Sequence, residues 1–377
     1  MKKRIKILFI HFDLGNGGAE RVLINLLHKL DHNKYDITLK TIFSGHNCTK
    51  LPGYIKFKPL FNRSAFRGMS RVLRVISPSL LYKWFVREDY DIEIAYLEQI
   101  PTRILGGGRR NLKTKKFAWV HNTTDCINDL NGGIYRSTDE MIRIYSSYDK
   151  IAFVSKGAED SFNRIFGTLI DSSKYNVVHN VNNFDQIKEL STEDIPITLE
   201  KNVVNLCSVG RLCGQKGYDR LIKSLGRISN NGITNWHLYL LGSGPEYDTL
   251  RAIAETFNIS KKITFLGFQT NPYKYLAKMD FFVCSSTKEG YSTAVTEAMI
   301  LGIPILTTNC SGMDEIIDQS NAGLIVGNSE VDLENGLMNI ITLDATDLCQ
   351  YKNNALLRGT ELANINCIDE FESFVCS

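Results

Sequence analysis

The 377-residue sequence predicts two α/β units in tandem, each built on a doubly wound parallel sheet. Short apolar runs alternate with helical segments along the whole chain, as in parallel sheets that helices cover on both faces. The alternation restarts near residue 203, after an irregular polar stretch at 191–202 that is typical of a linker. The chain is also too long for one ordinary hydrophobic core, so two domains are expected.

The strand predictions rest on apolar runs that are bounded by turn residues. They are 6–12, 37–43, 91–97, 116–122, 150–155 and 175–180 in the first half, and 202–210, 236–242, 262–267, 280–286, 304–309 and 323–327 in the second. In doubly wound sheets, ligands bind at the carboxyl ends of the strands. Motifs that follow these strands are therefore the first candidates for a functional site.

Composition excludes several classes of protein. Hydrophobic residues make up 43% of the chain and charged residues 23%, which is typical of a globular protein rather than a disordered one. No window reaches the length of an apolar membrane span, and the apolar run in "MKKRIKILFIHFD" is too short for a signal peptide. The nine cysteines form no CxxC pair, which favours a reducing compartment and argues against a zinc site. We therefore expect a protein that is cytoplasmic or lies on a membrane.

The two halves differ in charge. Residues 1–190 carry a net charge of +11 and the remainder −8. In the first half, a helix is expected from about Phe66 to Phe85 with four arginines along one side, beside apolar residues: Arg63, Arg67, Arg71 and Arg74. This pattern fits a solvated helix face or a surface that docks on anionic lipid. Nucleic acid is not expected, because no recognition motif or aromatic platform accompanies the charge.

The segment "KEGYSTAVTEAM", residues 288–299, reads as the turn and helix that follow a buried strand. Ser292 or Thr293 is the expected N-cap. Such a turn places backbone N–H groups and the positive end of a helix dipole beside it, which favours a phosphate. The carboxylates Glu289 and Glu297 flank this turn. They could form a catalytic acid and base, ligand contacts or a polar helix face, and we favour contacts to the hydroxyls of a nucleotide sugar.

Two further glycine-rich loops lie at strand ends. In "SVGRLCGQKGYDRL", Arg211 and Lys216 are five residues apart on a loop, where they could hold a diphosphate or simply be solvated. In "HFDLGNGGAERV", glycines precede a helix, but Glu20 stands where a dinucleotide fingerprint needs a small residue, so NAD is not expected. His121 ends a strand of the first half, and spacing alone assigns it no role.

These motifs in this order resemble glycosyltransferase family 4. "GNGGAERV", "VGRLCGQKG", "LLGSGPE", "ITFLGF" and "KEGYSTAVTEAMILGIPIL" carry the resemblance, which spans roughly residues 5 to 345. It implies a retaining enzyme with the GT-B fold, in which two Rossmann-like domains face each other across a cleft. The implied domains are an acceptor-side domain (1–188), a domain that binds the nucleotide sugar (189–358) and a closing helix (359–377) that crosses back to the first domain.

The resemblance also implies residue roles. The residues expected to act in catalysis are Arg211, Lys216, Glu289 and His121. The two cations would hold the diphosphate of the donor, Glu289 would bind hydroxyls of the transferred sugar, and His121 would touch that sugar. The other residues expected to bind the donor are Gly17, Gly18, Phe268, Gly290, Tyr291, Ser292 and Glu297. Among these, Glu297 would bind the ribose hydroxyls and Phe268 would lie along the base.

The implied substrates are a nucleotide sugar, with UDP favoured over GDP, and a lipid-linked saccharide in capsule, O-antigen or exopolysaccharide synthesis. No metal and no cofactor are expected, and the enzyme would lie on the inner face of the cell membrane. Two alternatives stay open: a nucleotide-sugar 2-epimerase of the same fold, and a binding module without catalysis.

Overall fold

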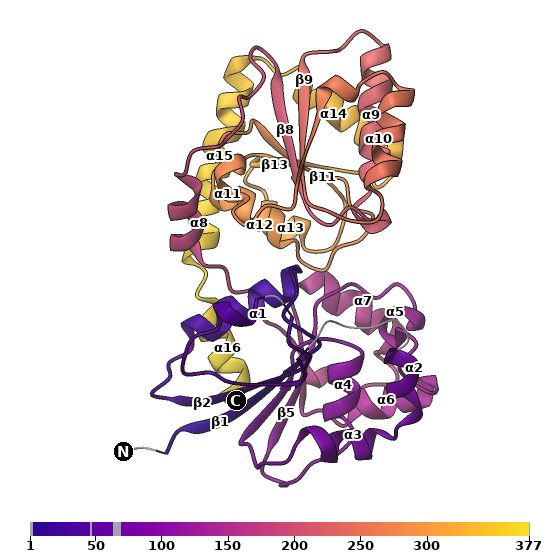
Figure 1. The fold of residues 1–377 in the computed structure, drawn as a ribbon, viewed down its shortest axis with the longest axis vertical. Helices are drawn as coiled ribbons and strands as arrows, with labels where there is room; N and C mark the ends of the chain where they lie inside the picture. Colours follow the sequence, from indigo (N-terminus) through magenta and orange to yellow (C-terminus); the bar gives the residue numbers. More distant parts are fainter. Residues whose placement is uncertain (1–2, 46, 63–68, 377) are drawn as a thin grey trace. The chain divides into compact units, whose positions relative to one another are not determined.

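The computed structural model describes residues 3–45, 47–62 and 69–376. The chain divides into two compact units, drawn in Figure 1. Unit 1 comprises residues 1–182 and 366–377, and unit 2 comprises residues 183–365. The chain therefore leaves unit 1, builds the whole of unit 2 and then returns to unit 1.

Unit 1 contains a seven-stranded parallel sheet in the order β3-β2-β1-β4-β5-β6-β7. Its strands are β1 (Ile5–His11), β2 (Tyr35–Phe43), β3 (Lys56–Phe61), β4 (Ile92–Ala95), β5 (Lys115–Val120), β6 (Lys150–Phe153) and β7 (Tyr175–Val177). The strand order reverses between β1 and β4, so this is a doubly wound sheet whose ligand site is expected at the carboxyl ends of these two strands.

Helices cover both faces of this sheet. They are α1 (Gly18–Lys29), α2 (Met69–Val75), α3 (Pro78–Phe85), α4 (Ile100–Leu105), α5 (Ile127–Asn131), α6 (Thr138–Ser146), α7 (Lys156–Phe166) and α16 (Cys367–Cys376). Short 3-10 turns lie at Cys48–Lys50 and Ser172–Lys174. Leu8 and Ile10 of β1 pack into one core together with residues of α3, α4, α6 and α7. Phe9 points to the opposite face, because side chains alternate along a strand, and there it stacks on Phe371 of α16.

Unit 2 contains a six-stranded parallel sheet in the order β10-β9-β8-β11-β12-β13. Its strands are β8 (Val204–Val209), β9 (Trp236–Leu241), β10 (Ile263–Gly267), β11 (Phe281–Cys284), β12 (Ile305–Thr308) and β13 (Gly323–Val326). Its helices are α8 (Phe184–Ser191), α9 (Tyr218–Asn230), α10 (Tyr247–Thr256), α11 (Tyr273–Leu276), α12 (Thr293–Ile300), α13 (Met313–Ile317), α14 (Glu330–Ile341) and α15 (Ala345–Asn364), with 3-10 turns at Gly214–Lys216 and Ser260–Lys262. The order reverses between β8 and β11, the two strands that precede the predicted phosphate loops.

All twelve predicted strands are present, and the structure adds β3. This strand was missed because it lies at the sheet edge, where three of its six side chains are exposed and the other three are partly exposed, and Pro59 weakens its pattern. Lys56 and Lys58 of β3 pair with Asp36 and Glu88.

The single helix expected from Phe66 to Phe85 is wrong in its described part. Two helices, α2 and α3, are separated at Ile76–Ser77. Pro78 begins α3, and the Ser77 hydroxyl caps it by accepting from Leu80 N at 3.3 Å. Proline disfavours the helical conformation of the residue before it, which ends α2.

The closing segment also differs in detail from the helix expected at 359–377. The first residues of this segment belong to α15, and the helix is interrupted at residues 365–366 before α16 begins. In α16, Phe374 packs against Phe117 and Trp119 of β5, with ring centroids 4.9 and 5.4 Å apart.

Candidate active site

The loop after β11 and the start of α12 form the centre of the candidate site in unit 2. Strand β11 ends at Cys284, a turn follows, and α12 begins at Thr293. The Ser292 hydroxyl is the N-cap and accepts from Val295 N at 3.4 Å. Gly302, with φ of +74°, follows the end of the helix. The strand, turn and helix predicted for this segment are therefore confirmed.

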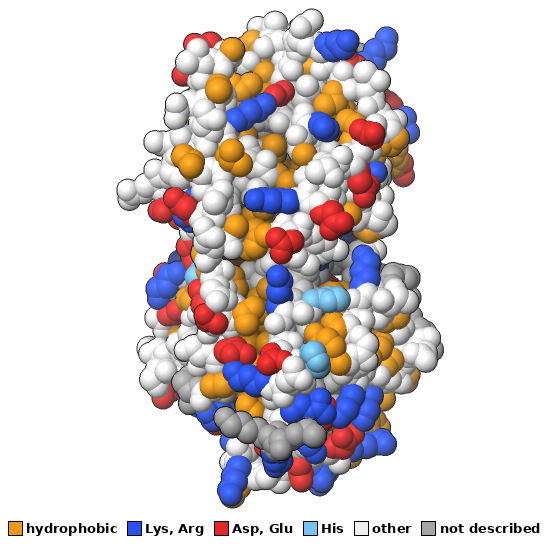
Figure 2. Space-filling model, turned by 90° about the vertical axis from the view of Figure 1, so that its left-hand side faces the viewer, with side chains coloured by type: hydrophobic (Ala, Val, Ile, Leu, Met, Phe, Trp, Pro, Cys, Tyr) orange, Lys and Arg blue, Asp and Glu red, His pale blue; other side chains and the backbone are white. Residues whose placement is uncertain are grey.

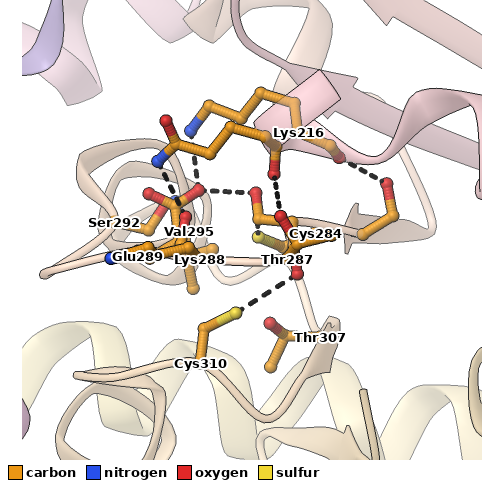
Figure 3. A network of polar contacts seen from close by, with 12 residues as sticks. Lys216, Cys284, Thr287, Lys288, Glu289, Ser292, Val295, Thr307 and Cys310 are labelled. Carbon is orange, nitrogen blue, oxygen red and sulfur yellow. Dashed lines mark hydrogen bonds and ion pairs between the residues drawn. The ribbon is translucent and has the colours of Figure 1, made fainter. Parts of the chain in front are cut away.

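An ion pair joins two predicted site residues that are distant in sequence. Lys216 Nζ lies 2.6 Å from Glu289 Oε1, and the Ser286 hydroxyl donates to the same oxygen at 2.5 Å. Figure 3 shows these contacts. Burial opposes the charge on Lys216, yet the adjacent Glu289 carboxylate raises the pKa of Lys216 above its ordinary value. The lysine is thus a permanent cation at the carboxyl end of the sheet.

Further hydrogen bonds fasten the loop of Lys216 to the loop of Glu289. Gln215 Nε2 donates to Lys288 O at 2.9 Å, and Thr287 N donates to Gln215 O at 2.8 Å. The Ser285 hydroxyl donates to Lys216 O at 2.9 Å. Because backbone and side chains both take part, the cation and the carboxylate are held in a fixed relation before any ligand binds.

Glu297 is buried inside α12 and has a different partner. Its Oε1 accepts from the Tyr273 hydroxyl of α11 at 3.0 Å. The hydrogen-bond partner of Glu297 thus differs from those of Glu289, which are Lys216 and Ser286.

The other predicted residues of unit 2 lie after β8, after β10 and in the turn before α12. Arg211 follows β8 and is exposed, and Phe268 follows β10 with 48% of its surface exposed. Gly290 and Tyr291 are buried in the turn before α12, where the Ser311 hydroxyl donates to Gly290 O at 3.2 Å.

The predicted residues of unit 1 lie at the ends of β1 and β5. Gly17 is the N-cap of α1 and Gly18 its first residue. A Cβ atom at Gly17 would lie 2.2 Å from Glu20 Oε2, so this position accepts only glycine without a shift of Glu20. His121 follows β5 and is buried, and burial lowers its pKa to about 3, an effect that nearby His11 reinforces. Its imidazole is therefore neutral.

Several residues of these sites carry no motif and were missed. Glu98, after β4, accepts from His121 N at 2.6 Å and Asn122 N at 2.8 Å, and so fixes the backbone that carries the histidine. Gln99 beside it has φ of +67°, a strained conformation that is common at functional loops. Ser286 holds Glu289 directly, and small polar residues at the end of β11 were its only signal in the sequence.

The family is decided by comparison with known sequences. The family described as "Glycosyl transferases group 1" matches residues 191–356, which contain the Lys216 and Glu289 loops. The lipopolysaccharide core biosynthesis glycosyltransferase LpsE of Rhizobium meliloti is 30% identical over 330 residues, covering 84% of this chain and 83% of the relative. The chain belongs to this glycosyltransferase group.

Another relative of this glycosyltransferase is a Campylobacter jejuni enzyme. It is named N-acetylgalactosamine-N,N'-diacetylbacillosaminyl-diphospho-undecaprenol 4-alpha-N-acetylgalactosaminyltransferase and is 28% identical over 92% of this chain and 93% of its own length. Among solved structures, HepE of Anabaena in complex with UDP and glucose superposes with a TM-score of 0.72 at 16% identity, covering 99% of this chain and all of the neighbour. This similarity shows the fold, which is GT-B as the sequence predicted.

No helix of this glycosyltransferase that lies within the described residues is long and apolar enough to cross a bilayer. In the same part of the chain, no group of three or more His, Cys, Asp or Glu side chains is arranged to hold a metal ion.

Proposed function

We propose that this glycosyltransferase is a retaining enzyme of family 4 that transfers a hexose or N-acetylhexosamine from a nucleotide sugar to a lipid-linked saccharide. A UDP-sugar is the favoured donor, and a GDP-sugar is the second choice. The observation that carries the proposal is the Lys216–Glu289 ion pair at the N-terminus of α12. The relatives support the acceptor, because the Campylobacter jejuni enzyme is named for a diphospho-undecaprenol-linked saccharide.

In this proposal the ion pair orients both partners for the donor. Lys216, a permanent cation, stabilises the negative charge that develops on the leaving diphosphate, and exposed Arg211 binds the same group. Glu289 accepts hydrogen bonds from hydroxyls of the transferred sugar. A fixed cation needs no reorganisation at the moment of transfer, so it lowers the barrier more than a mobile surface lysine would.

The remaining contacts are proposed for the other predicted residues. Glu297 accepts from the ribose, exposed Phe268 lies along the base, and the turn of Gly290, Tyr291 and Ser292 faces the phosphates at the start of α12. From unit 1, the α1 N-terminus at Gly17 and Gly18 and the neutral His121 are the groups proposed to contact the donor. Lysine and arginine can balance the phosphate charge, so the proposed transfer uses no metal ion and no cofactor.

We also propose that α2 docks the enzyme on the anionic inner face of the cell membrane. Arg71 and Arg74 are exposed, and the apolar Val72 and Val75 beside them are 55% and 77% exposed. Arg63 and Arg67, which belong to the same prediction, lie outside the described residues. Exposed valines among arginines can enter the headgroup layer while the cations bind lipid phosphates.

The anchoring of α2 supports this surface. Buried Arg103 of α4 pairs with Glu140 at 2.9 Å and donates to Leu73 O at 2.8 Å and Ile76 O at 3.0 Å. The carboxyl end of α2 is thus held by a buried guanidinium, while the side chains of Arg71, Val72, Arg74 and Val75 remain exposed and that of Leu73 is buried. On the face of unit 1 in Figure 2, which is turned away from α2, basic and acidic side chains are intermingled.

A donor screen tests the proposed function. The purified protein is incubated with UDP-, GDP- and ADP-sugars and a polyprenyl-diphosphate-linked saccharide, and products are identified by mass spectrometry and NMR. We expect transfer with retained anomeric configuration from one donor, and a loss of about 10²-fold or more in Lys216→Ala and Arg211→Ala. Lys223→Ala, which removes a lysine paired with Asp219 on α9, is the matched control and should stay active.

Other outcomes would replace the proposal. An epimerised nucleotide sugar without transfer would favour the 2-epimerase, and nucleotide-sugar binding without turnover would favour the binding module. An inverted product would remove the assignment to family 4.

A further inference from the structure

A buried guanidinium joins the segments that carry the candidate site of unit 2. Arg220 of α9 is 7% exposed. Its Nε donates to Ser285 O at 2.8 Å, its Nη2 to Ser286 O at 2.6 Å and its Nη1 to Asn328 O at 2.7 Å. All three acceptors are backbone carbonyls, so one side chain ties the loop after β11 to the segment after β13.

The charge of Arg220 is balanced without a carboxylate contact. In the part of the chain that the structure describes, no acid lies within ion-pair distance of it, and the nearby Asp219 and Glu330 pair with Lys223 and Arg227. Only neutral acceptors satisfy this buried cation, namely the three carbonyls and the Thr308 hydroxyl, which accepts from Nη2 at 3.4 Å. Hydrocarbon of similar volume would fill the same space without the desolvation cost. The arrangement therefore needs a reason other than packing.

That reason lies in the two serines that accept from Arg220. The Ser286 hydroxyl donates to Glu289 Oε1 at 2.5 Å, and the Ser285 hydroxyl donates to Lys216 O at 2.9 Å. Fixing the two carbonyls fixes the peptide planes of the serines, and with them the directions in which their hydroxyls reach. Arg220 is thus one residue removed from each partner of the ion pair.

A second contact converges on the same carbonyl. The Thr308 hydroxyl of β12 donates to Ser286 O at 2.6 Å, and the Cys310 thiol donates to the same oxygen at 3.2 Å. Three donors on one carbonyl oxygen exceed what a loop needs for satisfaction, since each carbonyl has two lone pairs. The carbonyl of Ser286 is therefore held from α9, from β12 and from the segment after β12.

We propose that Arg220 is a positioning residue that sets the geometry of Glu289 and Lys216 through the carbonyls of Ser286 and Ser285. The inference rests on the proposed function for its effect on turnover, but its structural part stands on the loop alone. A planar fork with three separate directions is required. A lysine keeps the charge yet offers one tetrahedral ammonium, so it cannot hold three carbonyls in this arrangement.

Hydrogen–deuterium exchange tests the structural part without any substrate. In Arg220→Lys, the amide of Thr287, which donates to Gln215 O at 2.8 Å, should exchange about tenfold faster, while the amides of β8 and β9 keep their protection. The matched control is Arg227→Lys, on the same helix, whose guanidinium pairs with Glu330 instead. It should leave residues 285–289 unchanged. Unchanged exchange in Arg220→Lys would overturn the proposal.

Turnover tests the functional part by a double-mutant cycle. Arg220→Lys should lower kcat about 10- to 100-fold with a smaller change in the KM for the nucleotide sugar, because displacement of a positioned group acts mainly on the reacting geometry. In a Glu289→Ala background the same change should cost at least about threefold less than in the wild type, since one of the two residues that it positions is gone. Equal losses in both backgrounds would refute positioning through Glu289.

Thr308→Val is a second variant that tests the proposal even if Arg220→Lys misfolds. It removes one of the bonds to Ser286 O with little change of shape, and it should shift both exchange and kcat in the same direction by a smaller factor. No shift in either measurement would count against the proposal. If exchange responds but the wild type transfers no sugar with any donor, the proposed function fails while the positioning of the loop by Arg220 stands.

Discussion

Substitutions of Glu289 can separate its hydrogen bonding from its charge. Oε1 of Glu289 accepts from Lys216 Nζ at 2.6 Å and from the Ser286 hydroxyl at 2.5 Å. In Glu289→Gln an acceptor oxygen remains at this position, whereas Glu289→Ala removes it and leaves the lysine without this partner. A binding role requires only the acceptor, but proton transfer requires the carboxylate itself.

The structure gives the size of both effects. Breaking a fully buried ion pair costs about 3–5 kcal/mol, and because the Lys216 side chain is 25% exposed we expect a loss of about 2 kcal/mol in unfolding free energy for Glu289→Ala. Glu289→Gln keeps an acceptor for both donors but loses the carboxylate charge that neutralises Lys216, so it should lose about 1 kcal/mol. For transfer, we expect a loss of about tenfold with glutamine and about 10²- to 10³-fold with alanine.

Initial rates of nucleotide release at saturating donor, measured beside thermal unfolding of the same preparations, check these values. The control is Glu334→Gln, whose carboxylate pairs with Arg227 at 2.5 Å on the helix layer of unit 2. It should lose stability but keep its rate. Equal rate losses for glutamine and alanine at position 289 would show that Glu289 transfers a proton and would refute its assignment as a binding group.

Three further predictions address the metal, the membrane and His121. Activity should survive EDTA, and loss on chelation that manganese or magnesium restores would contradict the metal-free scheme. Arg71→Ser combined with Arg74→Ser should weaken co-sedimentation with anionic vesicles at least tenfold, and added salt should weaken binding of the wild type in the same way. The control pair Lys261→Ser and Lys262→Ser should leave vesicle binding unchanged. Binding to neutral vesicles alone would refute docking by charge. Burial lowers the pKa of His121 to about 3 in the folded protein, so the unfolded chain binds a proton at this histidine first as the pH falls below about 6.5. The unfolding free energy should therefore drop between pH 7 and pH 4 by roughly 1–3 kcal/mol more in the wild type than in His121→Asn. Chemical denaturation at a series of pH values measures this difference.

The strands, their parallel arrangement and the phosphate loop could be predicted, because each depends on local patterns of a few residues. The approach of Lys216 to Glu289 could not, since 73 residues separate them and only the order of the strands brings their loops together. Glycine spacing located both loops but not their contact. Arg220 was missed for a related reason: on α9 it looks like any helical arginine, and its acceptors come from segments 65 to 108 residues away.

The break before Pro78 shows a different limit. The sequence contained the signal, since Ser77 and Pro78 form an ordinary helix start, but the spacing of the arginines suggested one continuous helix. Charge periodicity is weaker evidence than a proline, because it reports which face is solvated and does not constrain the backbone.

The return of the chain to unit 1 has a consequence for biosynthesis. The rings of Phe371 and Phe374 complete the aromatic layer around Trp119, yet α16 leaves the ribosome only after all of unit 2 has been made. Until then, the part of the first sheet that α16 covers lacks its partner, and the nascent protein exposes Phe9, Phe117 and Trp119 to solvent and chaperones. All residues of unit 2 are synthesised before α16, so unit 2 can finish folding before unit 1 does, although most of unit 1 is synthesised earlier. Early termination before residue 366 would leave unit 1 with an exposed aromatic surface and prone to aggregation.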